Sequence, residues 1–455
     1  MNQLPSITPS RGLAADFAAR VRVIATLAAP VTMARLGMLV LIMVDTAMIG
    51  HFSTTELAYY SLAQAVHMVG MLIGVGMLIG TAILCAQSVG AGVPRECGVI
   101  WRVSLLHAFV LGCVFAALAQ LGTWFYYQMG YPAGQADGAG GIVAVLNLGL
   151  PGQLVYTACI LFLESLSRPG PGLIIMIAAN IVNAGLNWLL IGGDIAMGAE
   201  GAAWATTAVR WLIALAAVVY ILCMRDAKRY NIAGPMDHWR AVSGKLRRLG
   251  YPLGLAQGLE SAAFASLTLF AGYISGQAAA GFQIVMSMIG FCFMAAIGVG
   301  TATAVHVGMA IGRKDQRQMM LSGWAGSFTI VVFMAAMAVV LSTFPEPLGR
   351  IFTDDPALLA IVVPTLLVGA AILVCDGAQG VLMGALRGAG DVWVPTALHL
   401  CSFLAVMVPA AGWLALRAGL GTPGLMWGTF CGVTLAAVLL AARFHVISKR
   451  PIGRL

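Results

Sequence analysis

Residues 80–92, GTAILCAQSVGAG, resemble residues 300–312, GTATAVHVGMAIG, although the two stretches lie far apart in the chain. Two further pairs keep nearly the same spacing: LSRPG from Leu166 with LRGAG from Leu386, and GAAWATT from Gly201 with GLMWGTF from Gly424. A spacing that is maintained across three pairs indicates an internal repeat. We therefore predict that the chain consists of two similar halves in the same orientation.

The composition places both halves in a membrane. Apolar residues make up 60% of the chain, charged residues only 9%, and the mean hydropathy is +0.92. Soluble domains carry far more charge. Apolar runs of about 20 residues, the length that crosses a bilayer, recur throughout. The polar residues 1–22 lack the apolar core of a signal peptide, so we expect the first span to be retained.

The predicted fold class is an all-α integral membrane protein with twelve transmembrane helices in two pseudo-symmetric six-helix lobes around a central cavity. The predicted spans are residues 25–50, 57–87, 101–127, 141–167, 172–193, 202–224, 252–275, 280–311, 321–344, 361–386, 394–416 and 423–445. The predicted domains are an N-terminal lobe (1–224), a cytoplasmic linker (225–250) and a C-terminal lobe (251–455). Parallel repeats of this kind are typical of secondary transporters that work by alternating access.

The basic residues predict the orientation of the spans. If the N-terminus is cytoplasmic, most of the 25 Lys and Arg residues fall on the cytoplasmic side, including the cluster between Arg225 and Arg248. This agrees with the positive-inside rule and predicts that both termini are cytoplasmic. The rule also explains the net charge of +8 better than a nucleic-acid partner does, so we expect no nucleic acid to bind.

Three acids within the predicted spans are candidates for function. Asp45 lies in MLVLIMVDTAMIG (residues 38–50), Glu260 in LAQGLESAAF and Asp376 in LVCDGAQG. An Asp near the centre of a membrane helix costs about 2.5–3.5 kcal/mol, and such residues commonly serve transport. The structural alternatives are a hydrogen bond to a neighbouring helix or a position that water reaches.

Asparagines in the fifth predicted span are candidate partners of Asp45. Asn180, Asn183 and Asn187 follow one another at i, i+3 and i+7, which places them on one stripe of a helix. Amide and carboxylate oxygens suit a small cation, while burial of a carboxylate also suits proton exchange. Thr206 adds a hydroxyl oxygen. Contact between helices is the alternative role for the asparagines, and we favour Asn183 and Asn187 as ligands.

The other polar residues of the predicted spans and loops are interpreted as structural or are assigned no role. We predict an i, i+4 ion pair between Glu164 and Arg168 and a helix N-cap in FTDDP, which contains Asp355. His67 and His306 are predicted to be packing residues, and Arg35 and Arg210 receive no role. The chain has no P-loop and no motif of a hydrolytic enzyme. We therefore expect a protein that is not an enzyme, has no cofactor and draws energy from an ion gradient.

Several stretches resemble a known family. VDTAMIGHFSTTELAYYSLA, FLESLSRPGPGLIIMIAANIVNAGLNWLLIGG and GVLMGALRGAGDVWVP are similar to signatures of the multidrug and toxic compound extrusion (MATE) transporters, over essentially the whole chain. The resemblance implies a cation-coupled (Na⁺ or H⁺) antiporter that exports amphipathic, often cationic, drugs. It also implies a multi-pass protein of the bacterial cytoplasmic (inner) membrane, with the lipid bilayer and small organic cations as its partners and a single chain as the working unit.

The resemblance also implies roles for individual residues. Glu260 and Asp376 match the second-lobe acids of the NorM-like branch, which are implicated in coupling and in substrate binding. The first-lobe polar site is matched by these residues: Asp45, Asn183, Asn187 and Thr206, the first three as possible Na⁺ ligands. Phe293 resembles a cavity-wall phenylalanine, with a core aromatic as the alternative. Ile372 stands where the family often has an aromatic residue, which weakens the case for a cation site in the second lobe.

Two other functions fit the same scaffold. A flippase or exporter of lipid-linked or other amphiphilic metabolites is the first alternative, because relatives with similar two-lobe bundles move such lipids. A wide basic cavity would favour that function, whereas the intramembrane charges singled out above are mostly acidic. A passive channel is the second alternative, and uphill transport would exclude it.

Overall fold

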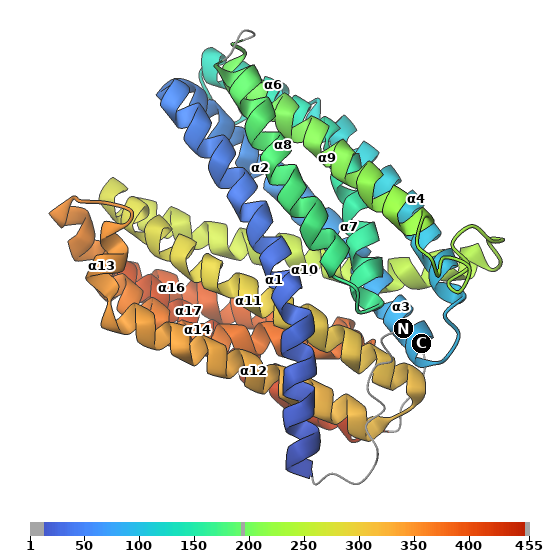
Figure 1. Ribbon diagram of the computed structural model, residues 1–455. Coiled ribbons are helices and arrows are strands. Elements are labelled where there is room, and N and C mark those ends of the chain that lie inside the picture. The colour runs from blue at the N-terminus through green and yellow to red at the C-terminus, as the bar shows by residue number, and fades with distance from the viewer. Residues whose placement is uncertain (1–12, 193–195, 451–455) are drawn as a thin grey trace. The chain divides into compact units, whose positions relative to one another are not determined.

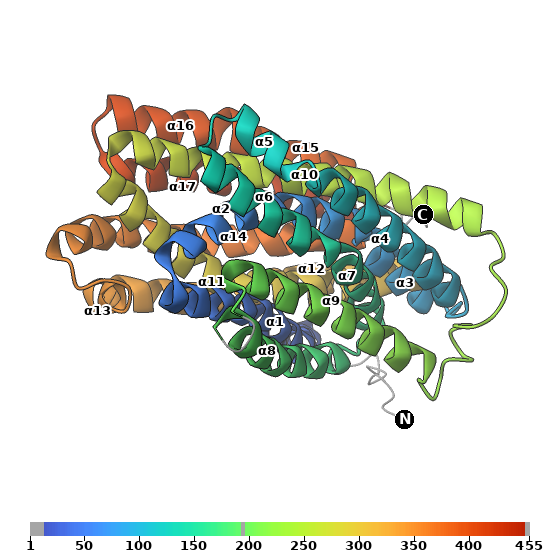
Figure 2. The same ribbon diagram turned by 90° about the horizontal axis from the view of Figure 1, so that it is seen from above.

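The computed structural model describes residues 13–192 and 196–450 and confirms the predicted fold class (Figures 1 and 2). The described residues form α-helices and two short π-helical segments, without any strand. Among the described residues, eleven helices are long and apolar enough to cross a membrane, and a bent pair of helices, taken as one span, brings the number to twelve. Arg11 and Arg454, which the orientation prediction places on the cytoplasmic side, lie outside the described residues.

The first nine helices cover the predicted spans one to six. They are α1 (Leu13–Phe52), α2 (Thr54–Leu78), α3 (Gly80–Gly90), α4 (Glu96–Ala119), α5 (Gly122–Gln128), α6 (Ala133–Leu148), α7 (Leu150–Ser165), α8 (Gly170–Ile191) and α9 (Gly198–Leu222). The fifth predicted span ends at residue 193, which lies outside the described residues.

The remaining helices cover spans seven to twelve. They are α10 (Trp239–Ile274), α11 (Gly276–Arg313), α12 (Gln316–Thr343), α13 (Pro345–Arg350), α14 (Pro356–Gly388), α15 (Trp393–Cys401), η1 (Ser402–Met407), α16 (Val408–Gly412), η2 (Trp413–Arg417) and α17 (Gly421–Ser448). Helix α10 begins inside the predicted linker. Asp355 is the N-cap of α14, as predicted, because its carboxylate accepts a hydrogen bond from the backbone N–H of Ala357 at 2.9 Å.

The helices form two compact units. The Asp45 unit comprises residues 33–261, and the Asp376 unit comprises the described residues of 1–32 together with those of 262–455. The unit boundaries fall inside α1 and α10, so each of these two helices contributes residues to both units. The division into two lobes joined by a linker at residues 225–250 remains a prediction.

Equivalent glycines make equivalent contacts in the two units. Helices α8 and α9 lie side by side (Figures 1 and 2), and a Cβ at Gly201 of α9 would lie 2.4 Å from the Leu190 carbonyl oxygen of α8. In the Asp376 unit, a Cβ at Gly424 of α17 would lie 2.8 Å from the Ala415 nitrogen of η2. Small residues allow such close approach of membrane helices. The two glycines that align in the sequence therefore also serve the same packing function.

The fourth span, predicted as one helix over residues 141–167, is broken. Helices α6 and α7 meet at a bend of 40°. Pro151 lies in the first turn of α7 and has no N–H to donate to the preceding turn. Side chains of α9 bond the carbonyl oxygens at the end of α6 instead: Thr207 with Val145 at 2.8 Å, Arg210 with Leu146 at 3.0 Å and Trp211 with Leu148 at 3.0 Å. A broken membrane helix requires such substitute donors.

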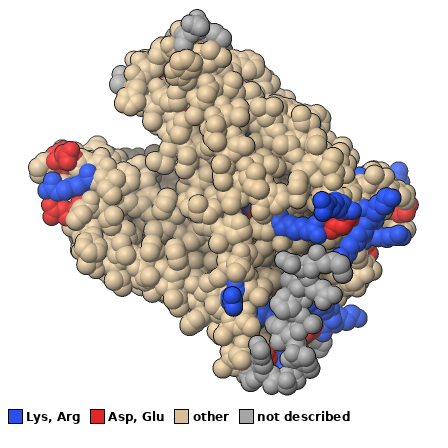
Figure 3. Space-filling view, in the orientation of Figure 1, with Lys and Arg blue, Asp and Glu red and all other residues tan. Residues whose placement is uncertain are grey.

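The outer sides of the helices carry few charges. Figure 3 shows Lys, Arg, Asp and Glu side chains gathered in a few places, with broad uncharged surface between them. Large apolar side chains are exposed on the helices, for example Ile181 and Trp188 of α8, which are 70% and 73% accessible. Surfaces of this kind are stable in contact with lipid chains rather than with water.

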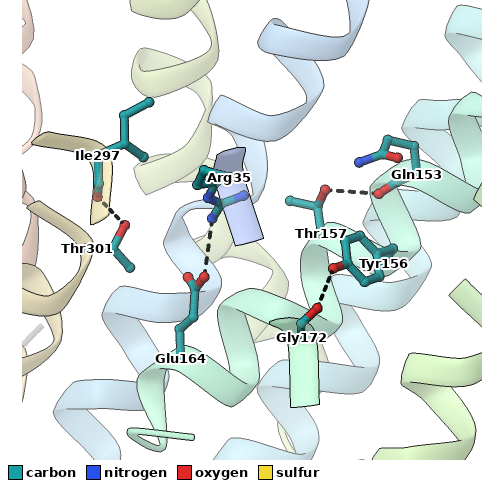
Figure 4. Close-up of polar contacts among 8 residues, drawn as sticks. All are labelled: Arg35, Gln153, Tyr156, Thr157, Glu164, Gly172, Ile297 and Thr301. Atoms are coloured by element: carbon teal, nitrogen blue, oxygen red, sulfur yellow. Dashed lines mark hydrogen bonds and ion pairs between the residues drawn. The ribbon is translucent and has the colours of Figure 1, made fainter. Parts of the chain in front are cut away.

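The predicted ion pair between Glu164 and Arg168 is wrong. Helix α7 ends at Ser165, and the backbone turns at Ser167, whose φ is 59°, so the two side chains do not share a helical stripe. Glu164 faces Arg35 of α1, with Nη2 and Oε1 3.3 Å apart (Figure 4). Arg168 instead donates two hydrogen bonds to Asp226, at 2.9 and 2.7 Å, and its guanidinium holds the pKa of that carboxyl below the usual value.

The two ion pairs predict different costs of removing an arginine. Glu164 is only 2% exposed, so Arg35→Gln should lower the free energy of unfolding by about 3 kcal/mol or more, because the buried carboxylate loses its partner. Arg168 is 41% exposed, so Arg168→Gln should cost less than about 1 kcal/mol. Thermal unfolding of both variants in detergent measures the difference. Equal costs would contradict the assignment of partners.

Candidate functional site

Asp45 is the centre of a fully buried polar cluster in the Asp45 unit. It has no accessible surface, and it lies within a membrane-length helix, two turns before the C-terminal end of α1. Its Oδ2 accepts hydrogen bonds from the hydroxyls of Tyr60, at 3.0 Å, and Thr206, at 2.7 Å. Its Oδ1 accepts a hydrogen bond from Nδ2 of Asn187 at 2.5 Å. Three donors from α2, α8 and α9 therefore converge on one carboxylate of α1.

The asparagines of α8 extend this cluster. Asn187 Nδ2 also donates to Asn183 Oδ1 at 3.2 Å, and Asn183 Nδ2 donates to the Thr206 hydroxyl at 3.4 Å. The i, i+4 spacing of the two asparagines places one above the other on α8. Asn180 instead donates to the Gly37 carbonyl oxygen at 3.1 Å and so connects α8 with α1. The sequence thus predicted which residues meet, while their role in cation coupling remains a prediction.

Two residues near Asp45 were missed from the sequence. Tyr60 is 2% exposed and gave no signal, because a tyrosine in an apolar helix is usually a packing residue. Arg210 lies one turn after Thr206 on α9, is 7% exposed and interacts electrostatically with Asp45 and Tyr60. An arginine at i+4 from a candidate ligand was a signal that could have been used.

His67 lies two turns after Tyr60 on α2 and is also buried. One ring nitrogen, Nδ1, is 3.2 Å from Oδ1 of Asn147, while the other, Nε2, has no hydrogen-bond partner among the described residues. Arg210 interacts electrostatically with this ring as well. The contact with Asn147 of α6 agrees with the packing role predicted for His67.

The oxygen atoms of the cluster fit a small cation. The residues that would supply them are Asp45, Asn183, Asn187 and Thr206, all of them buried. Oδ1 of Asn187 has no hydrogen-bond partner among the described residues, so it is available as a ligand once the amide turns it toward Asp45. Carboxylate, amide and hydroxyl oxygens are suitable ligands for hard cations such as Na⁺.

The second-lobe candidates are divided between the two units. Asp376 of α14 is 8% exposed and accepts a hydrogen bond from Gln379 Nε2 at 3.2 Å. Phe293 of α11 lies against the same helix one turn after Asp376, because a Cβ at Gly380 would lie 3.4 Å from the phenylalanine ring. Glu260 is half-buried on α10 and belongs to the Asp45 unit.

Comparison with known proteins shows that the chain is similar to members of one family. The MatE family model matches residues 30–189 and again residues 252–411. Two successive matches to one model agree with the internal repeat. A "Probable multidrug resistance protein NorM" of Caulobacter vibrioides is 37% identical over 93% of this chain and 91% of its own length. A protein of the same name from Bradyrhizobium diazoefficiens is 31% identical over 99% of this chain and 98% of its own length.

Solved structures show the same fold. A mutant of the Vibrio cholerae MATE transporter VcmN superposes with a TM-score of 0.88 and 16% identity, covering 95% of this chain and 98% of that chain. At this identity the similarity establishes the fold alone.

Proposed function

The chain belongs to the MatE family of multidrug efflux transporters, and from that premise we propose that it exports amphipathic, mainly cationic, compounds in exchange for Na⁺ or H⁺. The buried carboxylate of Asp45, with its three hydrogen-bond donors, is the observation that carries the proposal. An ionisable group at membrane depth is costly, and transport of a cation is a common reason for its presence.

The energy of one cation is sufficient for concentrative export. A driving force of ~150 mV acting on one charge supplies roughly 3.5 kcal/mol, which corresponds to a gradient of about 300-fold. Coupling requires that the cation and the drug favour different conformations, because a ligand with equal affinity for both states shifts nothing. In our proposal, cation binding at the Asp45 site stabilises the state from which the drug is released outside.

Alternating access follows in this proposal from the two similar halves. Parallel repeats of six helices can rock against each other, so that one substrate site is exposed to each side in turn. In this proposal the chain is a multi-pass transporter of the inner membrane, with both termini in the cytoplasm and a single chain as the working unit. It would use no cofactor and catalyse no chemical reaction.

Asp376 is proposed to attract the positive charge of the drug beside the aromatic ring of Phe293, and Glu260 of the Asp45 unit is proposed as a further acid for coupling and substrate binding. Asp376→Asn should weaken binding of a fluorescent organic cation by about tenfold or more, since one buried attractive charge is lost. An uncharged amphipathic substrate of similar size should bind as it does to the wild type. Equal weakening for both compounds would instead assign Asp376 a structural role.

The flippase alternative is not favoured. The relatives described above are named multidrug resistance proteins, and the buried acids of the present chain suit cations better than anionic lipid head groups. The function is tested by uphill movement of an organic cation in liposomes under an imposed ion gradient. Absence of such movement for every cation tried would return the flippase to consideration.

A further inference from the structure

Arg210 places a permanent positive charge beside the proposed cation site. It is one helical turn beyond Thr206, whose hydroxyl donates to Asp45 Oδ2 at 2.7 Å, so both side chains lie on one stripe of α9. Arg210 is 7% exposed, and its charge interacts with both Asp45 and Tyr60. A guanidinium keeps its proton in proteins, so this charge cannot be removed during transport.

The guanidinium of Arg210 is also held in place. Its Nη1 donates to the Leu146 carbonyl oxygen at the C-terminal end of α6, where a cation is favoured. The neighbouring donors Thr207 and Trp211 bond the same helix end. A Cβ at Gly149 would lie 3.0 Å from Arg210 Cδ, so the side chain is closely packed. The charge therefore cannot move far away when another cation arrives.

The hydrogen bonds of Asp45 oppose a metal cation as well. Both carboxylate oxygens already accept hydrogen bonds, and Asn187 presents its Nδ2 rather than its Oδ1 to the carboxylate. A metal ion at this position would require the Asn187 amide to turn and would lie near Arg210. The charged and titratable groups that act here are Tyr60 of α2 and Arg210 of α9, with His67 of α2 close to Arg210.

We propose that Arg210 determines ion specificity, because its fixed charge competes with metal cations for Asp45 and weakens binding of Na⁺ to the oxygen cluster. This inference rests on the proposed function, in which Asp45 receives the coupling cation. It assigns to Arg210 a role in selecting that cation. The hydrogen bond from Arg210 to the Leu146 carbonyl oxygen holds the charge at the site.

Binding of radioactive Na⁺ to the purified full-length protein in detergent tests this proposal. Arg210→Gln should bind Na⁺ at least tenfold more tightly than the wild type, a change of about 1.4 kcal/mol. The gain should disappear when Asp45→Asn is added. Arg210→Lys keeps a charge, and Trp211→Phe removes only the bond to Leu148, so both should bind Na⁺ as weakly as the wild type.

A folded Arg210→Gln protein that binds Na⁺ no more tightly than the wild type would overturn the proposal. If this variant does not fold, Na⁺ binding by the wild type tests the proposal. If the wild type binds Na⁺ at Asp45 with a dissociation constant below about 1 mM, the proposal that Arg210 weakens Na⁺ binding is contradicted. If no such binding is found, the result supports the proposal. Drug efflux by the wild type is measured separately. Failure of efflux would count against the proposed function, whereas the Na⁺-binding result alone tests the role of Arg210.

Discussion

Asp45→Asn is expected to abolish concentrative drug export while the protein still folds and inserts. The drug gradient that one coupled charge can maintain, roughly 300-fold at ~150 mV, should fall to about 1. An asparagine has nearly the same shape but cannot carry a negative charge or accept a proton at neutral pH. Its carbonyl oxygen can still accept from Thr206 or Tyr60, so packing of the cluster should be largely kept.

The measurement is accumulation of a fluorescent organic cation in cells that express each variant at equal levels. Thr46→Val is the matched control, because the Thr46 hydroxyl donates only to the Ile42 carbonyl oxygen of its own helix, at 2.8 Å. This control should export as the wild type does. Full export by Asp45→Asn would exclude the carboxylate as the coupling group and leave it a structural acid.

Gly428→Ala is expected to lower the stability of the protein strongly. Gly424, Gly428 and Gly432 form a ridge of small residues along α17 that faces the preceding span. A Cβ at Gly428 would lie 2.2 Å from the nitrogen and 2.3 Å from the Cα of Ala411 in α16, and backbone atoms cannot yield as a side chain can. Separation of the two helices should lower the free energy of unfolding by about 3 kcal/mol or more.

Gly290→Ala of α11 is the matched control for this substitution. A Cβ at Gly290 meets no atom within 4 Å, and alanine favours a helix by about 1 kcal/mol over glycine, so the variant should unfold at the same or a higher temperature. Thermal unfolding in detergent measures both changes. A Gly428→Ala protein as stable as the wild type would show that α16 and α17 do not pack as closely as described.

The sequence predicted the spans and the Asp45 partners Asn187 and Thr206 for the same reason. Hydropathy over about 20 residues is a local property, and the i, i+3, i+7 spacing of the asparagines is local too. One acid in the first predicted span (residues 25–50) and one polar stripe in α8 left few other ways to satisfy both sets of side chains. Burial of polar groups in lipid without partners is too costly for them to remain apart.

Contacts between distant segments were less accessible from the sequence. Glu164 has a nearby arginine at i+4, yet its partner is Arg35, because the turn at Ser167 interrupts the helical spacing. The bend between α6 and α7 has a local signal in Pro151, but the donors that make the break tolerable come from α9, about 60 residues later in the chain. Tyr60 reaches the Asp45 site through packing of α2 beside α1, which neither segment encodes alone, whereas Arg210 could have been inferred from its i+4 position after Thr206.

In the proposed mechanism, an ion gradient drives export through Asp45. The most direct test loads the purified protein into liposomes and follows a fluorescent organic cation under separately imposed Na⁺ and pH gradients. We predict that one of these gradients drives uphill movement, which no passive channel can produce, and that Asp45→Asn abolishes it. Uphill movement that is unchanged in Asp45→Asn, or no uphill movement under either gradient, would contradict this account.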